Sequence, residues 1–340
     1  MTQIVFIISA FVLTYFGVGV FRRWSVRREI LDVPNERSSH TVPTPRGGGL
    51  VIVLVCLLFY TIYAGFTVRR FSFAYLGGAV LIAVISWFDD LKSVPAALRF
   101  LFHAIGAALA IFALGGWQKI YLPLAGEIDL GLIGIILTFF WIIWLTNAYN
   151  FMDGIDGIAG TQGLTAGTGW LLVGLFFNLE ITGFLGGVLA LSNLGFLMHN
   201  WQPAKIFMGD VGSAFLGYTF AVLPLIAANE LQGSSQPKFT ATAVFLVWLF
   251  VFDTLYTFFR RLLRGEKFWR AHRSHLYQRL VISGYSHRFV TILYGVLSSV
   301  ILAAVLYWLR AANAPDALPV LLASTIGAGI IILCYGKENG

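Results

Sequence analysis

Long apolar segments alternate with short polar loops along the whole chain. The apolar segments have the length and composition of helices that cross a bilayer, although several are short for a hydrocarbon core roughly 30 Å thick. The pattern therefore predicts about eleven membrane-spanning helices. The predicted spans are residues 4–21, 48–66, 73–88, 100–116, 131–146, 164–177, 183–198, 214–228, 239–258, 289–309 and 317–335.

Composition indicates the same fold class. Of the 340 residues, 58% are hydrophobic and 11% are charged, and the mean hydropathy is +0.80. No soluble domain buries that much apolar surface, so we expect an all-α polytopic integral membrane protein with one domain, residues 1–340. The two cysteines, Cys56 and Cys334, lie inside apolar segments and predict neither a disulfide framework nor a metal site.

The basic residues predict how the spans are oriented. Arg22, Arg23, Arg27 and Arg28 follow the first span, which is the opposite polarity to a cleaved signal peptide. An N-terminus outside and a cytoplasmic C-terminus place eighteen of the 23 Lys and Arg residues in cytoplasmic loops. The net charge of +7 therefore follows membrane topology and does not indicate nucleic-acid binding. The predicted cytoplasmic loops are residues 22–47, 89–99, 147–163, 199–213 and 259–288.

The stretch 147–157 carries the strongest chemical signal, because it places Asp153 and Asp156 at the mouth of a predicted span. Charge at a membrane boundary is costly and usually functional. If the stretch is helical, the two carboxylates share a face and repel each other unless a cation or a proton intervenes. A divalent metal that also holds a phosphorylated substrate is the natural occupant. The alternative is a helix cap followed by a tight glycine turn.

Other carboxylates occupy matching places. Asp89 and Asp90 follow the third span and Asp210 follows the seventh, each where a helix emerges on the predicted cytoplasmic side. All five aspartates can therefore converge on one site at the membrane surface. An ion-coupled secondary transporter is the rival class, but it would place carboxylates near the bilayer midplane and often in two related halves.

Three further loops belong to this surface. Residues 43–49 form a Pro-Gly loop with Arg46, whose glycine N–H groups could approach an anion at a helix start. Residues 206–213 set Asp210 between glycines, with Phe207 three positions earlier. The loop 260–288 is basic, which suits either anionic lipid or phosphate binding. Its candidate substrate-binding residues are His272, Arg273, His275 and Arg279.

These motifs, in this order and on this topology, resemble the polyprenyl-phosphate N-acetylhexosamine-1-phosphate transferases. The resemblance covers nearly the whole chain, and residues 271–280 are most similar to the O-antigen and capsule branch. It implies transfer of a sugar-1-phosphate from a UDP-sugar to undecaprenyl phosphate with release of UMP. It also implies Mg²⁺ as cofactor, with Mn²⁺ as an alternative, and a bacterial inner-membrane protein whose active site faces the cytoplasm. Oligomeric state is open, and a homodimer is one alternative.

The resemblance also implies roles for single residues. Asp210 is the first choice as metal ligand, with Asp153 or Asp90 as the second. Asp89 resembles a residue proposed as general base, although a phosphate monoester is already mostly dianionic at neutral pH. Residues implied in binding or positioning the nucleotide and its phosphates are Asn147, Asn150, Asp156 and Phe207, the last by stacking on uracil.

The chain departs from its relatives in two places. Tyr277 and Gln278 occupy positions where relatives have histidines, and Ser93 replaces a lysine, with Lys92 one position earlier. No role is therefore carried over from those histidines or that lysine. We expect the segment from Trp269 to Arg279 to choose among donor sugars, because the diphosphate elements contact groups that every nucleotide sugar shares. The identity of the sugar, the polyprenol length, and a one-step or covalent-intermediate route stay open.

Overall fold

The computed structural model of the chain describes residues 2–34, 42–67, 73–231, 238–267, 272–311 and 313–338. Nearly all secondary structure in these ranges is helical, which confirms the predicted fold class. A π-helical segment, Thr61–Thr67, continues α2. The helices are α1 (Thr2–Arg27), α2 (Gly49–Tyr60), α3 (Phe73–Leu91), α4 (Ala96–Leu114), α5 (Leu132–Phe151), α6 (Ile158–Phe177), α7 (Glu180–Asn200), α8 (Asp210–Glu230), α9 (Lys238–Leu246), α10 (Trp248–Leu263), α11 (Leu276–Ile282), α12 (His287–Arg310) and α13 (Ala317–Glu338).

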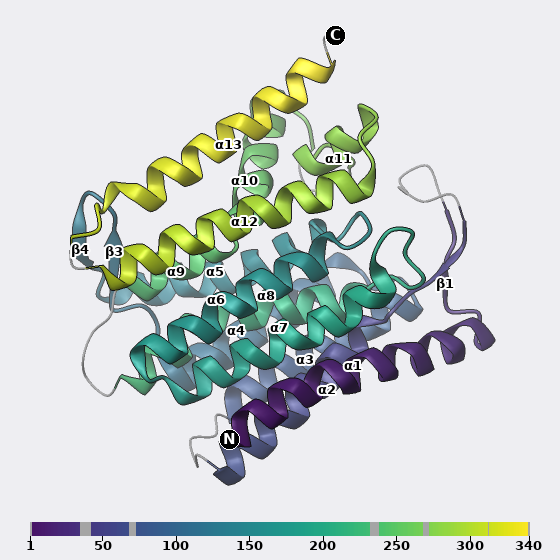
Figure 1. Cartoon of the computed structure of the whole chain (residues 1–340), viewed down its shortest axis with the longest axis horizontal. Coiled ribbons are helices and arrows are strands. Elements are labelled where there is room, and N and C mark those ends of the chain that lie inside the picture. Colours follow the sequence, from purple (N-terminus) through teal and green to yellow (C-terminus); the bar gives the residue numbers. More distant parts are fainter. Residues whose placement is uncertain are drawn as a thin grey trace.

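Helices α7 and α8 form the centre of the bundle. Buried residues make up 94% of the most apolar stretch of α8 and 83% of that of α7, against 17% for α1. Accordingly, α1 runs along one edge of the bundle and α13 along the opposite edge (Figure 1). Because α8 is enclosed by other helices, its first residue, Asp210, is held by neighbours on several sides.

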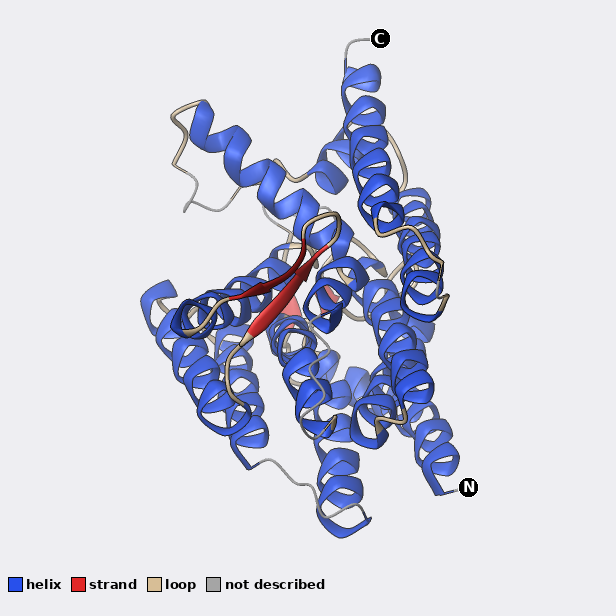
Figure 2. Cartoon of the chain, turned by 90° about the vertical axis from the view of Figure 1, so that its left-hand side faces the viewer, coloured by secondary structure: helices blue, strands red, loops and turns tan. Residues whose placement is uncertain are grey.

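Two short antiparallel ribbons add to the predicted all-helical architecture. Strands β1 (Leu31–Asp32) and β2 (Thr44–Pro45) pair before α2. Strands β3 (Lys119–Leu122) and β4 (Gly126–Asp129) form a hairpin between α4 and α5, with Lys119 opposite Asp129. The hairpin crosses the end of the bundle that faces the viewer in Figure 2. Both ribbons lie outside the helical segments, so the core remains helical.

The predicted count of eleven spans is not confirmed. Every predicted span falls on a helix or on two consecutive helices. In the described part of the chain, however, eight helices are long and apolar enough to cross a membrane, or nine if α9 and α10 form one bent span. Helix α2 is short, and α6 carries Thr161, Gln162 and Thr165 among glycines, which lowers its hydropathy.

The ninth predicted span, 239–258, is broken rather than straight. Helices α9 and α10 meet at an angle of 77°. A break frees backbone groups that must find other partners inside an apolar bundle. The Gln162 amide nitrogen donates to the Leu246 carbonyl at the break (2.8 Å), and the Ser298 hydroxyl donates to the Gln162 carbonyl oxygen (3.1 Å). These two bonds stabilise the bend.

Helices α1 and α13 run in the same direction, so the two termini lie at opposite ends of the bundle (Figure 1). This arrangement fits the prediction that the termini lie on opposite sides of the membrane. Which end faces the cytoplasm stays a prediction.

The start of α2 is packed directly against the start of α8. A Cβ atom at Gly49 would overlap the Cα of Gly212, so only glycine allows this approach. The Gly48 and Gly49 N–H groups donate to the carbonyls of Phe207 and Met208, both at 2.9 Å. The contact therefore joins two of the loops that the sequence assigns to the site.

Substituting Gly49 tests the importance of this contact. Gly49→Ala should lower Tm and enzymatic activity, because the added methyl forces α2 away from α8. Gly77→Ala is the matched control: the nearest atom to its new Cβ would be Leu109 Cδ1 at 3.9 Å, and alanine favours the helix. Thermal unfolding in detergent measures both variants. An equal loss of Tm in Gly49→Ala and Gly77→Ala would show that the close contact between α2 and α8 is not important.

Candidate active site

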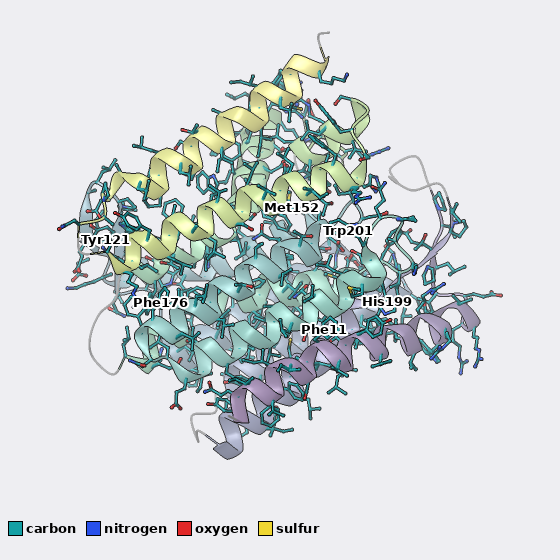
Figure 3. All side chains as sticks on the ribbon, viewed as in Figure 1. Phe11, Tyr121, Met152, Phe176, His199 and Trp201 are labelled. Carbon is teal, nitrogen blue, oxygen red and sulfur yellow. The ribbon has the colours of Figure 1, made fainter. Side chains whose placement is uncertain are left out.

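Five loops meet at one end of the bundle. The Phe207 N–H donates to the Pro45 carbonyl (2.8 Å), and the Gly157 N–H donates to the Asn200 side-chain oxygen (2.9 Å). Met152 and Trp201, from the ends of α5 and α7, lie toward this end, and Tyr121 and Phe176 lie toward the other (Figure 3). The predicted convergence of the aspartate loops is therefore present in the structure.

Asp90 holds the start of α8. Its two carboxylate oxygens accept from the backbone N–H groups of Asp210 and Val211, each at 3.0 Å. The side chain is almost fully buried, and Gly209 makes room for it with a φ of +77°. A Cβ at Gly209 would lie 2.6 Å from Asp90 Oδ2. Asp90 was predicted as a catalytic or metal-binding residue, but here its oxygens cap a helix.

Arg46, in the β2–α2 loop, also binds the end of α3 next to Asp90. Its Nε donates to the Asp90 carbonyl (2.8 Å) and lies 3.7 Å from Asp90 Oδ1, while Nη2 donates to the Asp89 carbonyl (3.0 Å). A guanidinium at the C-terminal end of α3 is favoured by the helix dipole. The N–H groups of Gly48 and Gly49 in this loop donate to backbone carbonyls, so neither of these two is available to an anion.

Arg99 joins Asp89 to Asp210, and the sequence analysis did not select it. Its Nη1 lies 2.5 Å from Asp89 Oδ2 and 3.2 Å from Asp210 Oδ2. The other Asp89 oxygen accepts from the Val94 N–H at 2.6 Å. In the sequence, Arg99 is one of the basic residues of the predicted cytoplasmic loops. Its position in the first turn of α4, shortly after two aspartates, was the available signal.

The two predicted asparagines have different surroundings. Asn150 donates to Asp210 Oδ2 (3.1 Å) and accepts from the Ser213 hydroxyl (2.8 Å), which fixes the orientation of its amide. Asn147 lies one turn deeper, where it donates to the Ile143 carbonyl and its nitrogen lies 3.1 Å from His103 Nδ1. Of these two asparagines, Asn150 is the one that contacts an aspartate of the site, Asp210.

Asp153 is the carboxylate left without a partner. Its side chain makes no hydrogen bond to the part of the chain that the structure describes. Burial, assisted by the charges of Asp210 and Asp90, raises the pKa of Asp153 well above its usual value. Asp156 is used differently, since its oxygens accept from the Ala204 N–H (3.1 Å) and lie 3.5 Å from His287 Nδ1.

The last basic loop contacts the central motif through Tyr277, whose hydroxyl donates to the Phe151 carbonyl (2.9 Å). His272 and His275 lie together in this loop, with ring centroids 5.0 Å apart. Burial, with nearby positive charges, lowers the pKa of His272 to about 4, so its ring is neutral at pH 7.

Three further residues were predicted to bind substrate. The Arg279 backbone N–H donates to the His275 carbonyl (2.9 Å), and its guanidinium lies 4.3 Å from the centre of the Tyr335 ring. Arg273 and Phe207 are half-buried. Trp269, at the start of the predicted selectivity segment, lies outside the described residues.

Sequence reasoning also missed Asp253. Its carboxylate is buried on α10 and accepts hydrogen bonds from the last basic loop, including one from the Leu276 N–H (2.8 Å). The available signal was an ionisable residue inside an apolar span, which is rarely present without a function.

The donor set fits a hard divalent cation at Asp153 and Asp210. In the described ranges, no three or more His, Cys, Asp or Glu side chains form a ready-made metal cluster. Mg²⁺ needs only one or two carboxylates when substrate phosphates complete its shell. Among the described residues, the Asp153 side chain has no hydrogen-bond partner. Asp210 Oδ2 accepts from Asn150 and from the Arg99 guanidinium, which a bound cation could replace. Asp90 fits less well, because both its oxygens are engaged.

Comparison with known proteins agrees with this chemistry. Residues 72–228 match the family described as Glycosyl transferase family 4. The chain is also 30% identical over 324 residues to the probable undecaprenyl-phosphate N-acetylglucosaminyl 1-phosphate transferase of Bacillus subtilis (strain 168), covering 89% of this chain and 87% of that relative. The chain belongs to glycosyl transferase family 4.

Other relatives in this comparison span different bacteria. The decaprenyl-phosphate N-acetylglucosaminephosphotransferase of Mycobacterium leprae is 31% identical over 84% of this chain and 78% of its own length. The undecaprenyl-phosphate alpha-N-acetylglucosaminyl 1-phosphate transferase of Yersinia pestis is 27% identical over the same shares. Membership of glycosyl transferase family 4 confirms the resemblance drawn from the motifs and gives the transporter alternative no support.

Asp153 makes no hydrogen bond to the described residues, whereas Asp156 accepts one from the Ala204 N–H, so the two carboxylates should affect stability differently. An acid whose folded-state pKa is raised costs stability as pH rises from about 4 through that raised value. At neutral pH, Asp153→Asn should therefore raise the metal-free Tm, by about 1–2 °C for each kcal/mol relieved in a chain of 340 residues. Asp156→Asn is the control and should bring no gain, because its carboxylate is already satisfied. If both variants gain equally, relief of net charge is the better explanation.

Proposed function

We propose that this protein transfers an N-acetylhexosamine-1-phosphate, or a deoxy derivative, from a UDP-sugar to undecaprenyl phosphate and releases UMP. The observation that carries the proposal is the group formed by Asp89, Asp153 and Asp210 at one end of an apolar bundle, with Arg99 between two of them. Relatives whose names state such a reaction cover most of the chain.

Charge is the main obstacle to this reaction, because both substrates are anionic and the site is acidic. The carboxylates of Asp210 and Asp153 would hold Mg²⁺, with Mn²⁺ as a substitute. The bound ion would neutralise the diphosphate and stabilise charge on the departing UMP. Arg99 supplies a second positive group that can turn from Asp210 toward a phosphate. Asn150 keeps the Asp210 carboxylate in a fixed orientation.

Asp89 is better suited to positioning than to deprotonation. Both its oxygens already accept hydrogen bonds, from Arg99 and from the Val94 N–H. A lipid phosphate with a second pKa near 6 needs little help to lose its proton at pH 7. Asp89 therefore holds Arg99 at the place where the acceptor phosphate enters.

The membrane surface supports a lipid acceptor. Phe88 and Phe151, at the ends of α3 and α5, are 55% and 56% exposed close to the aspartates. Apolar side chains at this depth favour an isoprenoid chain beside a polar headgroup site. We place the site on the cytoplasmic face of a bacterial inner membrane, because the positive-inside rule orients the loops that way.

We propose that the basic loop 260–288 selects the donor sugar. Fewer of its residues are involved than the predicted segment from Trp269 to Arg279 contains. Tyr277 is fully buried, and the Gln278 side-chain oxygen accepts from the His275 N–H (3.4 Å). These two residues therefore shape the loop. His272 and Arg273, which are half-buried, and His275, which is 5% exposed, are the residues that we propose to meet the donor. Similarity of residues 271–280 to the O-antigen and capsule branch supports initiation of a surface polysaccharide.

A transfer assay tests the reaction itself. Purified protein with Mg²⁺, undecaprenyl phosphate and a panel of UDP-sugars should release UMP and form a lipid-linked sugar diphosphate. UDP-N-acetylglucosamine is the first donor to try. A chelator should stop the release, and Mn²⁺ should restore part of it. Absence of UMP with every donor in the panel would contradict the proposal.

Substitution of Asp210 tests the metal site. Asp210→Asn should lower turnover by several orders of magnitude and weaken Mn²⁺ binding measured by electron paramagnetic resonance, because a metal ligand is lost. Glu127→Gln is the control, since this exposed carboxylate lies in the β3–β4 hairpin and pairs with Lys119. A folded Asp210→Asn variant that keeps normal Mn²⁺ affinity would remove Asp210 from the ligand set.

A further inference from the structure

Asp253 is a fully buried carboxylate outside the group of aspartates described above. Its side chain is 1% exposed. Burying a charge is costly unless several hydrogen bonds replace its water. The donors are the Leu276 N–H (2.8 Å), the Tyr277 N–H (3.1 Å), the His275 ring nitrogen Nδ1 (3.1 Å), the Tyr294 hydroxyl (3.1 Å) and the Thr257 hydroxyl (3.2 Å).

These bonds fix the loop that carries the donor-site histidines. Three of the five come from consecutive residues, His275 to Tyr277, where the chain enters α11. The Tyr277 hydroxyl then donates to the Phe151 carbonyl and lies directly over Gly154. Asp253 is thus linked through one residue to the stretch that carries Asp153.

The bond to His275 also selects one form of its ring. An ionised carboxylate can only accept, so Nδ1 must carry the hydrogen. In the neutral ring, Nε2 is then an acceptor. It makes no hydrogen bond to the residues that the structure describes. The ring lies between His272 and Phe151, with centroid distances of 5.0 and 6.4 Å, at the edge of the central motif.

We propose that Asp253 is a positioning residue that holds His275 with Nε2 as an acceptor for an O–H or N–H group of the donor sugar. This role rests on the proposed function. A hydroxyl or an acetamido N–H differs among UDP-sugars, whereas the diphosphate does not. A site that hydrogen-bonds such a group can reject an analogue that lacks it far more strongly than an apolar pocket can. Asp253 therefore contributes to the choice of sugar without contacting it.

Asp253→Asn tests this role because the amide keeps the size of the side chain but can donate. The amide has one oxygen in place of two, so it can no longer accept from His275 Nδ1, the Leu276 N–H and the Tyr277 N–H together, and the preference for hydrogen on Nδ1 weakens. We expect kcat/KM for the preferred UDP-sugar to fall by roughly 10–100-fold, mainly through KM, as when a group that orients a ligand is removed. Tyr294→Phe is the matched control: it removes one bond to the same carboxylate without touching His275, and should stay within about twofold.

A double-mutant cycle separates positioning from general support of the fold. If Asp253 acts through His275, then Asp253→Asn should cost little more in a His275→Ala background. Losses that multiply would overturn the proposal. Nitrogen NMR of ¹⁵N-histidine protein gives a readout independent of activity, with the His275 signal assigned by its loss in His275→Ala. The native protein should show the Nδ1–H form, and Asp253→Asn should show a larger share of the Nε2–H form.

These experiments distinguish a failure of the role of Asp253 from a failure of the proposed transfer reaction. Native protein that shows the Nε2–H form, or an Asp253→Asn variant that keeps its donor preference, overturns the role of Asp253 even when UMP is released. Native protein that releases no UMP from any donor overturns the proposed function, whatever form of His275 the NMR spectrum shows.

Discussion

The hydrogen bonds from the Asp210 and Val211 N–H groups to Asp90 are the contact on which the site depends. A carboxylate at the start of a helix is favoured by the helix dipole, and charge-assisted hydrogen bonds are stronger than neutral ones. The contact joins the end of α3 to the start of α8, and Arg46 secures it from a third loop. Asp210 consequently points out of the most deeply buried helix in a fixed direction.

The five aspartates are divided between support and chemistry. Asp90 and Asp156 accept from backbone N–H groups and hold loops together, while Asp89 holds Arg99. Asp153 and Asp210 are left closest to being free. Burial of Asp153, together with repulsion from Asp210 and Asp90, raises its pKa and opposes folding. Proteins retain such costly groups where function requires them, which explains why this acidic surface persists at the end of an apolar bundle.

Hydropathy predicted where the helices lie, because that signal is local. It also predicted that the loops carrying Asp89, Asp153 and Asp210 share one end. It could not assign partners, since these depend on contacts between distant residues: Arg99 and Asp210 are 111 positions apart. For the same reason the sequence did not show that Asp90 caps α8 or that the Arg279 guanidinium lies against the Tyr335 ring. Asp253 lies inside a predicted apolar span, so its polar partners could not be read from the local pattern. The bend between α9 and α10 is stabilised by the bond from Gln162 to Leu246, which are 84 positions apart.

The angle between α9 and α10 also determines the depth at which a charge can sit. At a rise of 1.5 Å per residue, a straight helix from Lys238 to Leu263 would be about 39 Å long, with Asp253 roughly 23 Å from its start. That depth lies inside a hydrocarbon core of about 30 Å, where a carboxylate would find few donors. The 77° turn shortens the path along the bundle and directs Asp253 sideways to α11. A substitution at the buried break between α9 and α10 would therefore also displace Asp253 and the segment 275–277 that it holds.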